Sequence, residues 1–258
     1  MKPPTTRAAP AFISHSRETG TDYVIYVDAP DPGRTPGPWT GVLLMDGDFL
    51  FDPAVGAVRS LRASGAAPAL LVGVGYGAGF GARGNFRGRD YTPTAAPGEP
   101  ASGGADRFLE YLAGSLWPEL ARRYPLGGAG RGIAGHSVGS LLVLHALFQD
   151  RPFFNLGLAS APSIWWDDRS ILRLASSLRD RRASLPATLF LGAGEDDTPS
   201  MIGDLALLEE QLRGRAFKGL RVVSRRFAGR DHYNVVPDSL RAGLAALLGP
   251  ARGRRAKP

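Results

Sequence analysis

Short apolar runs alternate with longer amphipathic stretches along most of this chain, and this alternation constrains the fold more than any other feature. Several of the short runs are apolar without interruption, as expected of strands that are covered on both faces of a parallel sheet. The longer stretches carry apolar residues at helical spacing. The pattern therefore predicts an α/β fold with a mostly parallel central sheet and helices on both of its faces.

The predicted elements extend from residue 22 to residue 249 without an internal repeat. Strands are expected at residues 22–30, 40–51, 67–77, 130–135, 154–163, 187–194 and 220–229. Helices are expected at residues 105–126, 138–150, 169–183, 201–215 and 237–249. We predict one domain over residues 1–250 with no large separate lid domain, followed by a disordered basic tail at residues 251–258.

Composition excludes several classes of function. The chain has no cysteine, which rules out disulfides and Cys-based metal sites, and we expect neither a metal nor a cofactor. Despite a net charge of +7, no basic helix or nucleic-acid-binding motif is present, so no nucleic-acid partner is expected. No apolar run approaches the length of a membrane span, and the N-terminus lacks the apolar segment of a signal peptide. We expect a cytoplasmic protein, and nothing indicates its oligomeric state.

A G-x-S-x-G pentapeptide, Gly135 to Gly139, places Ser137 between a predicted strand and a predicted helix. In α/β enzymes this pentapeptide forms a sharp turn that exposes a nucleophilic serine. The chain contains 34 glycines in 258 residues, so the pentapeptide alone is weak evidence. Its place between strand and helix makes Ser137 the candidate nucleophile.

Acids and a histidine follow later strands. Glu195, Asp196 and Asp197 come directly after the strand at 187–194, and His232 follows the last predicted strand. Because the carboxyl ends of parallel strands share one edge of the sheet, these side chains should lie near Ser137. An imidazole can take the serine proton, and a carboxylate can hold and stabilise the imidazole. The chain order of serine, acid and histidine is that of α/β-hydrolases.

The choice of individual triad members rests on position. His232 is preferred because it alone lies in a polar loop after a late strand. The remaining histidines are His15, His136 and His145. Asp197 is preferred as the acid because it leaves room for one helix and one strand before His232. Asp196 and Glu195 remain alternatives.

Two backbone N–H groups are candidates for an oxyanion hole. Val138 follows the nucleophile at a helix N-terminus, where N–H groups are free to bind an anion. Asp48 follows Asp46 and Gly47 after an early strand, and glycine permits an unusual backbone angle there. An ordinary Asp-Gly turn explains the same residues equally well.

Six stretches of the chain resemble the Putative esterase family of α/β-hydrolases. They are LLMDGDFLF, RDYTP, GGADRFLEYLAGSLWPELARRYPL, GIAGHSVGSLLVLHALFQDRPFFNLGLASAPSIWW, LFLGAGEDD and GRDHYNVVP, in the family's order. The family includes enterochelin-esterase-like siderophore hydrolases, S-formylglutathione hydrolases, feruloyl esterase modules and mycolyltransferases. The absence of cysteine argues against an S-formylglutathione hydrolase.

The resemblance implies a serine carboxylesterase of the α/β-hydrolase fold that works through an acyl-enzyme intermediate. It implies a catalytic triad and an oxyanion hole made of Ser137, His232, Asp197, Asp48 and Val138. Substrate contacts are expected from Trp165, Trp166, Arg89 and Tyr91. The expected partner is a small-molecule ester, such as a siderophore or an aromatic, feruloyl-type ester.

Two other functions remain open. An acyltransferase would use the same chemistry with a sugar or lipid alcohol as acceptor. A non-catalytic binding module could share the fold, since fold alone does not decide function. The joint presence of Ser137, Asp197 and His232 argues against the second alternative.

Overall fold

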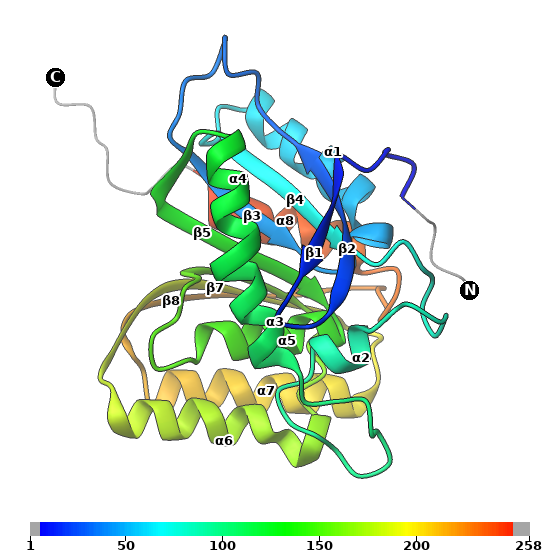
Figure 1. The fold of residues 1–258 in the computed structure, drawn as a ribbon. Helices are drawn as coiled ribbons and strands as arrows, with labels where there is room; N and C mark the ends of the chain where they lie inside the picture. The colour runs from blue at the N-terminus through cyan, green and yellow to red at the C-terminus, as the bar shows by residue number, and fades with distance from the viewer. Residues whose placement is uncertain (1–5, 250–258) are drawn as a thin grey trace, which may run out of the picture.

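A computed structural model describes residues 6–249 and places all strands of that range in one sheet, ordered β1-β2-β4-β3-β5-β6-β7-β8 (Figure 1). β2 pairs antiparallel with both β1 and β4, and the strands from β4 to β8 run parallel. The strands are β1 (Phe12–Ser16), β2 (Thr21–Asp28), β3 (Trp39–Leu44), β4 (Ala69–Gly75), β5 (Leu126–His136), β6 (Leu156–Ser160), β7 (Ser184–Gly194) and β8 (Lys218–Phe227). The predicted α/β fold with a mostly parallel sheet is confirmed.

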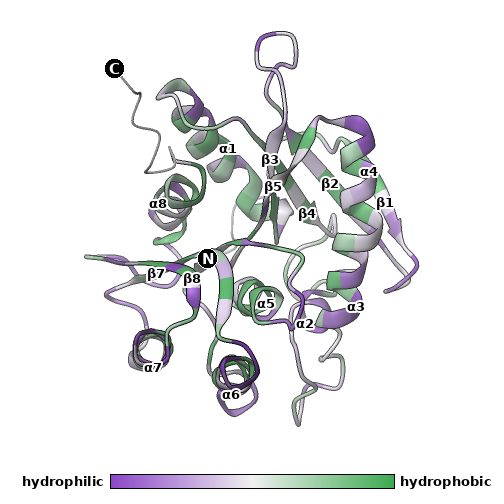
Figure 2. Ribbon diagram, turned by 90° about the vertical axis from the view of Figure 1, so that its left-hand side faces the viewer, coloured by the Kyte–Doolittle hydropathy of each residue, from purple (hydrophilic) through white to green (hydrophobic). Residues whose placement is uncertain are grey.

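Helices cover both faces of this sheet. One face carries α1 (Gly47–Ala63) and α8 (Val236–Leu248), which contact each other and enclose one apolar core. The other face carries α3 (Ala105–Glu110), α4 (Trp117–Arg123), α5 (Val138–Leu147), α6 (Trp166–Arg181) and α7 (Pro199–Gly214) over a larger core. In Figure 2, α5 is hydrophobic along its length, whereas the outer helices α6 and α7 have polar sides. A helix that is apolar all round is expected where the chain is buried on every side.

The N-terminal part of the chain differs from the prediction. β1 was not among the predicted strands, and the second predicted strand extended to Phe51. The strand in fact ends at Leu44, and the left-handed backbone of Asp46 (φ 54, ψ 43) turns the chain into α1. The apolar residues after Asp46 are buried at helical spacing, among them Ala54 and Val58. A short apolar run does not distinguish these two periods.

The predicted helix at 105–126 contains a change of winding. Its central turn is the π-helix η1 (Tyr111–Leu116), between α3 and α4. Phe108, Leu112, Leu116 and Leu120 are all fully buried, as their spacing of four predicted. The wider turn of a π-helix keeps residues four apart on one face. Pro118 has no N–H and so cannot donate the backbone hydrogen bond of an ordinary α-helix.

The remaining elements connect these layers to the strand ends. The short helix α2 (Arg87–Asp90) lies in the long glycine-rich connection between β4 and α3. No helix within residues 6–249 is both long enough and apolar enough to cross a membrane. The predicted basic tail at 251–258 lies outside the described residues.

Candidate active site

Ser137 lies on a strained turn between β5 and α5. Its backbone angles, φ 57 and ψ −122, are disfavoured for a residue with a side chain. A Cβ on Gly135 would lie 2.4 Å from the carbonyl carbon of Gly139, so the turn tolerates no side chain there. The Ser137 N–H donates to the Ser160 carbonyl at 2.9 Å, and Ser140 Oγ donates to the same carbonyl at 2.7 Å. Contacts with β6 and the close packing of Gly135 against α5 thus hold a conformation that the chain would not adopt alone.

The side chains of Ser137, His232 and Asp197 form one continuous chain of polar contacts. His232 Nε2 lies 3.1 Å from Ser137 Oγ, and His232 Nδ1 lies 3.0 Å from Asp197 Oδ2. Asp197 Oδ1 accepts a hydrogen bond from the Thr198 N–H at 2.7 Å. The Asp197 side chain is fully buried, so both carboxylate oxygens are directed by protein partners rather than by water. The fold therefore brings together the three residues chosen from the sequence.

Glu195 and Asp196 are exposed, in contrast to Asp197. Their backbone N–H groups join the turn after β7 to the end of β8 and the loop that follows it. The Glu195 N–H donates to the Phe227 carbonyl at 3.0 Å, and the Asp196 N–H donates to the Arg230 carbonyl at 2.9 Å. These two residues hold the loop of His232 through their backbone, while their side chains face solvent.

His136 contacts the ring of His232, which the sequence analysis did not anticipate. The two imidazole centroids are 4.8 Å apart, and His136 Nδ1 lies 3.1 Å from Ser160 Oγ. Burial, together with the nearby His232 and Arg87, lowers the pKa of His136 to about 3. His136 is therefore neutral near pH 7 and presents an uncharged ring to His232.

Val138 and Asp48 each occupy the first turn of a helix, where backbone N–H groups lack an intrahelical acceptor. The two helix N-termini are neighbours: a Cβ on Gly139 would lie 3.3 Å from Asp46 Oδ2 and 3.4 Å from Met45 Cβ. The turn before Asp48 is thus packed against the turn of the candidate nucleophile. This is the arrangement that an oxyanion hole built from two loops needs.

The Asp48 carboxylate has a different role from its backbone. It is buried and accepts hydrogen bonds from Tyr26 Oη at 2.8 Å, the Tyr76 N–H at 2.6 Å and the Gly77 N–H at 3.1 Å. A Cβ on Gly75 would overlap this carboxylate at 2.6 Å. The side chain therefore joins the start of α1 to the end of β4.

Asp46 is held by Arg87 on α2 and by Tyr91 directly after that helix. Arg87 donates two hydrogen bonds to the Asp46 carboxylate, Nε to Oδ1 and Nη2 to Oδ2, both at 2.9 Å. The Asp46 N–H donates to Tyr91 Oη at 3.0 Å, and Tyr91 is fully buried. We call Arg87, Asp46 and Tyr91 the turn clamp. The contact between Arg87 and Asp46 was not predicted, because the two residues are far apart in the chain.

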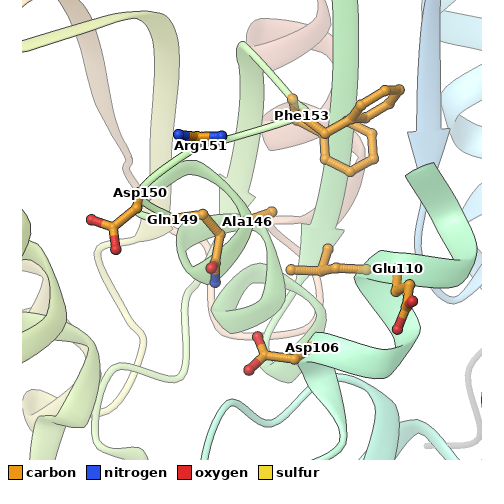
Figure 3. A pocket seen from close by; sticks show the side chains of 9 residues that line it. Asp106, Glu110, Ala146, Gln149, Asp150, Arg151 and Phe153 are labelled. Atoms are coloured by element: carbon orange, nitrogen blue, oxygen red, sulfur yellow. The ribbon is translucent and has the colours of Figure 1, made fainter. Parts of the chain in front are cut away.

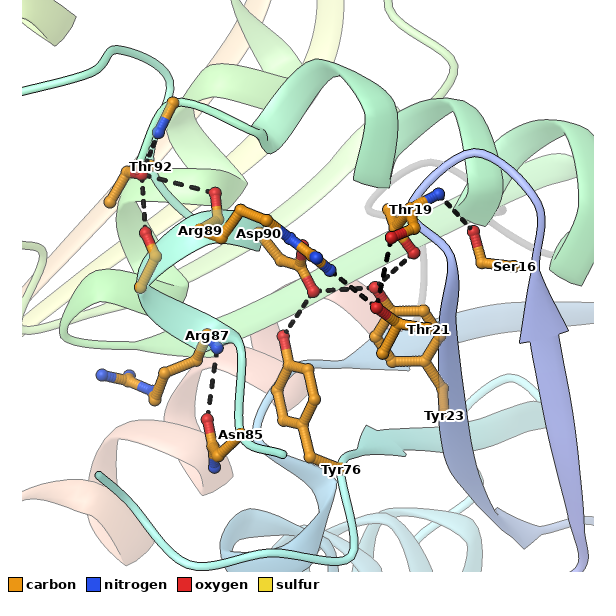
Figure 4. A network of polar contacts seen from close by, with 12 residues as sticks. Ser16, Thr19, Thr21, Tyr23, Tyr76, Asn85, Arg87, Arg89, Asp90 and Thr92 are labelled. Atoms are coloured by element: carbon orange, nitrogen blue, oxygen red, sulfur yellow. Dashed lines mark hydrogen bonds and ion pairs between the residues drawn. The ribbon is translucent and has the colours of Figure 1, made fainter. Parts of the chain in front are cut away.

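Arg89 belongs to a buried network around Asp90 (Figure 4). The Asp90 carboxylate, which is fully buried, accepts hydrogen bonds from Tyr23 Oη at 2.7 Å, Tyr76 Oη at 2.9 Å and Arg89 Nε at 2.7 Å. Arg89 Nη2 also donates to Thr21 Oγ1 at 2.8 Å. Arg89 is therefore part of a hydrogen-bond network that joins the β1–β2 hairpin to α2.

An open pocket of about 390 Å³ contains the candidate nucleophile. Its lining residues are Ser137, Ser163, Trp165, Asp197, Thr198, Ser200, Met201, His232 and Tyr233. The lining includes neither Arg89 nor Tyr91, which were expected to flank it. Trp165 is 48% exposed and forms one wall, whereas Trp166 is buried and its Nε1–H donates to the Thr94 carbonyl at 3.2 Å. Of the two tryptophans, Trp165 alone lies in the pocket, and Trp166 packs in the core.

A larger hollow, of about 470 Å³, lies near the far end of α5 (Figure 3). It is lined by Asp106, Leu109, Glu110, Ala146, Gln149, Asp150, Arg151, Phe153 and Phe154. Its lining has no serine, and Asp106 is paired with His145 at 2.7 Å. Volume therefore does not identify the reactive site here. Within residues 6–249, no group of three or more His, Cys, Asp or Glu side chains is arranged to hold a metal ion.

Comparisons with known proteins relate this fold and site to esterases. The family model described as Putative esterase matches residues 16–232. The ferri-bacillibactin esterase BesA of Bacillus subtilis is 28% identical, with alignment over 91% of this chain and 88% of that protein. The siderophore triacetylfusarinine C esterase of Aspergillus fumigatus is 29% identical, over 90% of each chain.

Solved structures give the same relation. The crystal structure of BES protein from Bacillus cereus has a TM-score of 0.82 and 25% identity, covering 96% of this chain and 98% of that one. The siderophore hydrolase EstB from Aspergillus nidulans has a TM-score of 0.80 and 25% identity, covering 97% and 99%. The likeness therefore extends over nearly the whole of both chains in each pair.

Proposed function

Because this chain belongs to the Putative esterase family and is a carboxylic ester hydrolase, we propose that it cleaves a siderophore ester through a Ser137–His232–Asp197 triad. The observation that carries the proposal is the continuous path from Ser137 Oγ through His232 to the buried carboxylate of Asp197. The names of two relatives that align with at least 90% of this chain support a siderophore as the ester.

In the proposed reaction, Ser137 Oγ attacks the ester carbonyl carbon while its proton passes to His232 Nε2. The Nδ1–H of His232 donates to Asp197, which keeps the imidazole in the required tautomer and stabilises its charged form. His232 then protonates the alcohol that leaves, and an acyl group remains on Ser137. A water molecule, deprotonated by the same imidazole, releases the acid and restores the serine.

The negative charge that develops on the carbonyl oxygen needs fixed donors. We assign these to the N–H groups of Val138 and Asp48, at the N-termini of α5 and α1. Both N–H groups lie in a first helical turn, where the helix dipole also favours an anion. The turn clamp would keep the Asp48 amide in place before the charge forms, which is the condition for effective electrostatic stabilisation.

The test compares the wild type with Ser137→Ala on p-nitrophenyl acetate and on a catecholate trilactone. Loss of the nucleophile should lower kcat by roughly 10⁴-fold or more. The far-UV circular dichroism spectrum should stay unchanged, because the fold does not depend on this hydroxyl. Ser163→Ala is the matched control, because Ser163 Oγ lies 3.3 Å from Ser137 Oγ but has no base beside it in the proposed mechanism. It should lose less than about tenfold, the scale of one hydrogen bond.

Product analysis separates the hydrolase from the acyltransferase. Mass spectrometry should find the free acid as the main product even when a sugar or lipid alcohol is present. A new ester as the main product would favour acyl transfer, and near wild-type turnover by Ser137→Ala would reject the triad.

We also propose that residues 1–250 act as one catalytic domain, since every described strand belongs to one sheet.

A further inference from the structure

A turn of left-handed backbone separates the pocket wall from the body of α6. Asp167, Asp168 and Arg169 have φ values of 46, 48 and 59 and ψ values of 58, 49 and 38. A residue with a side chain rarely adopts this conformation, and consecutive examples are rarer because each adds steric strain. Trp165, which lines the pocket, lies two residues before this turn, and Trp166 stands between them. Strain of this kind persists only where surrounding contacts impose it.

Two arginines impose the turn. Arg169 Nε donates to Asp204 Oδ1 at 2.6 Å, and the Asp204 side chain is 3% exposed. The other oxygen of Asp204, Oδ2, is buried and has no hydrogen-bond partner in the described structure. Arg173 donates to the carbonyls of Asp167 and Asp168, so it holds the backbone of the turn from one helical turn later.

The ion pair also joins the two segments that contribute Trp165 and Met201 to the pocket. Asp204 lies on α7, one helical turn after Ser200 and Met201, which line the same pocket as Trp165. Residues three and four apart share one side of a helix, so a displacement of α7 at Asp204 moves its pocket-lining turn as well. The left-handed turn and the ion pair therefore connect Trp165 to Met201.

We propose that the left-handed turn at residues 167–169, held by the Arg169–Asp204 ion pair, sets the width of the acyl pocket between Trp165 and Met201. Arg169 and Asp204 are then positioning residues that determine which acyl groups fit. This inference rests on the proposed function, because it concerns the pocket of the proposed nucleophile. An acyl group that reaches Trp165 depends on the turn, whereas an acetyl group does not reach that far.

Asp168 allows the backbone to be tested separately from the side chain. Its side chain is 88% exposed, and its one ion pair within residues 6–249 is a 3.4 Å contact with Arg173. Asp168→Gly and Asp168→Val both remove this carboxylate. Glycine adopts φ near +48 freely, whereas a β-branched residue is strongly disfavoured there. The two variants therefore differ in whether the left-handed turn can form.

The measurement is kcat and KM for p-nitrophenyl acetate and p-nitrophenyl benzoate. We expect Asp168→Gly to keep the wild-type ratio of kcat/KM values for benzoate over acetate, with an unchanged or higher Tm. Asp168→Val should raise KM for the benzoate roughly tenfold, the scale of one lost apolar pocket contact, while the acetate constants stay within about twofold. Trp165→Ala should lower the ratio to a similar extent.

Arg169→Gln tests the ion pair in the same assay, and Arg181→Gln is its control on the same helix. Arg181 pairs with Asp150, whose side chain is 67% exposed, and neither residue lines the pocket. Arg169→Gln should lower the benzoate-to-acetate ratio, and Arg181→Gln should not. The acetate kinetics and the Tm show in each case that the variant is folded.

The outcomes distinguish this inference from the proposed function. A wild type that hydrolyses neither ester overturns the proposed function and the inference with it. A wild type that hydrolyses both, together with an unchanged ratio in Asp168→Val and Arg169→Gln, overturns the inference alone. A ratio that falls equally in Asp168→Gly and Asp168→Val also overturns it, since the carboxylate and not the backbone would then matter.

Discussion

At the scale of single residues, the environment of each carboxylate separates Asp197 from the acids beside it. Asp197 is buried, with one oxygen directed to His232 and the other to the Thr198 N–H. Glu195 and Asp196 are exposed and contribute backbone hydrogen bonds. Their side chains cannot reach the imidazole without breaking the turn that holds the loop of His232.

We therefore expect Asp197→Asn to reduce kcat by roughly 10³- to 10⁴-fold, because an amide can hold His232 in the wrong tautomer. Asp196→Asn and Glu195→Gln should each change kcat by less than about threefold, as exposed surface changes usually do. The measurement is steady-state hydrolysis of p-nitrophenyl acetate by the three variants. If Asp196→Asn loses activity while Asp197→Asn stays active, Asp196 and not Asp197 is the acid of the triad.

At the scale of elements, the important junction is the one between β3 and α1. Asp46 is left-handed there, and helix formation from Gly47 onward places the Asp48 amide in the first turn. Arg87 on α2 and Tyr91 directly after it hold Asp46, and both belong to a connection more than 40 residues later in the chain. A loop far along the sequence thus controls the geometry of the proposed oxyanion hole.

Tyr91→Phe removes the acceptor of the Asp46 N–H and leaves that group buried without a partner. This should destabilise the protein by about 1–3 kcal/mol. It should also lower kcat by roughly tenfold, because a displaced oxyanion donor loses part of the 10²- to 10³-fold contribution of such a group. Urea unfolding and ester hydrolysis measure the two effects separately.

Tyr23→Phe is the matched control for this experiment. It also removes a buried tyrosine hydroxyl, but one that donates to Asp90 and does not contact Asp46. We expect a similar loss of stability with kcat nearly unchanged. If Tyr91→Phe likewise affects stability alone, the Asp48 amide is not an oxyanion donor.

At the scale of the whole molecule, packing between the sheet and its helices keeps His136 neutral. The folded protein lowers the pKa of His136 to about 3, whereas the unfolded chain has the ordinary value of 6.5. Below pH 6.5 the unfolded state therefore binds a proton that the folded state does not. The free energy of unfolding must then fall as the pH falls from 6.5 toward 3, by at most about 1.4 kcal/mol per pH unit.

His136→Asn removes this titration and should flatten the acid side of the stability curve. Between pH 7 and pH 5, the wild type should lose about 1–2 kcal/mol more free energy of unfolding than the variant. The range extends down to about 1 kcal/mol because His136 is partly exposed and solvent screens its interactions. Urea denaturation at both pH values measures the difference. Equal losses in the two proteins would mean that His136 is protonated in the folded state.

Local patterns determined much of this protein. The alternation of apolar runs and amphipathic stretches predicts the α/β sheet, because the spacing of apolar residues that distinguishes strand from helix is a property of neighbouring residues. The same rule that active sites form at the carboxyl ends of parallel strands predicted that Ser137, Asp197 and His232 would meet. The structure brings these side chains within hydrogen-bonding distance.

Tertiary structure alone decided which way each side chain on this edge faces. Arg89 and Tyr91 follow a strand end, as the triad residues do. Arg89 is nevertheless bound to Asp90 and Tyr91 to Asp46, so both belong to the hydrogen-bond network beside the pocket and do not line it. Of two adjacent tryptophans, Trp165 lines the pocket, whereas Trp166 is buried and donates a hydrogen bond to the Thr94 carbonyl. Such orientations depend on partners that are distant in the chain. The spacing of residues within a short segment does not reveal which partners these are.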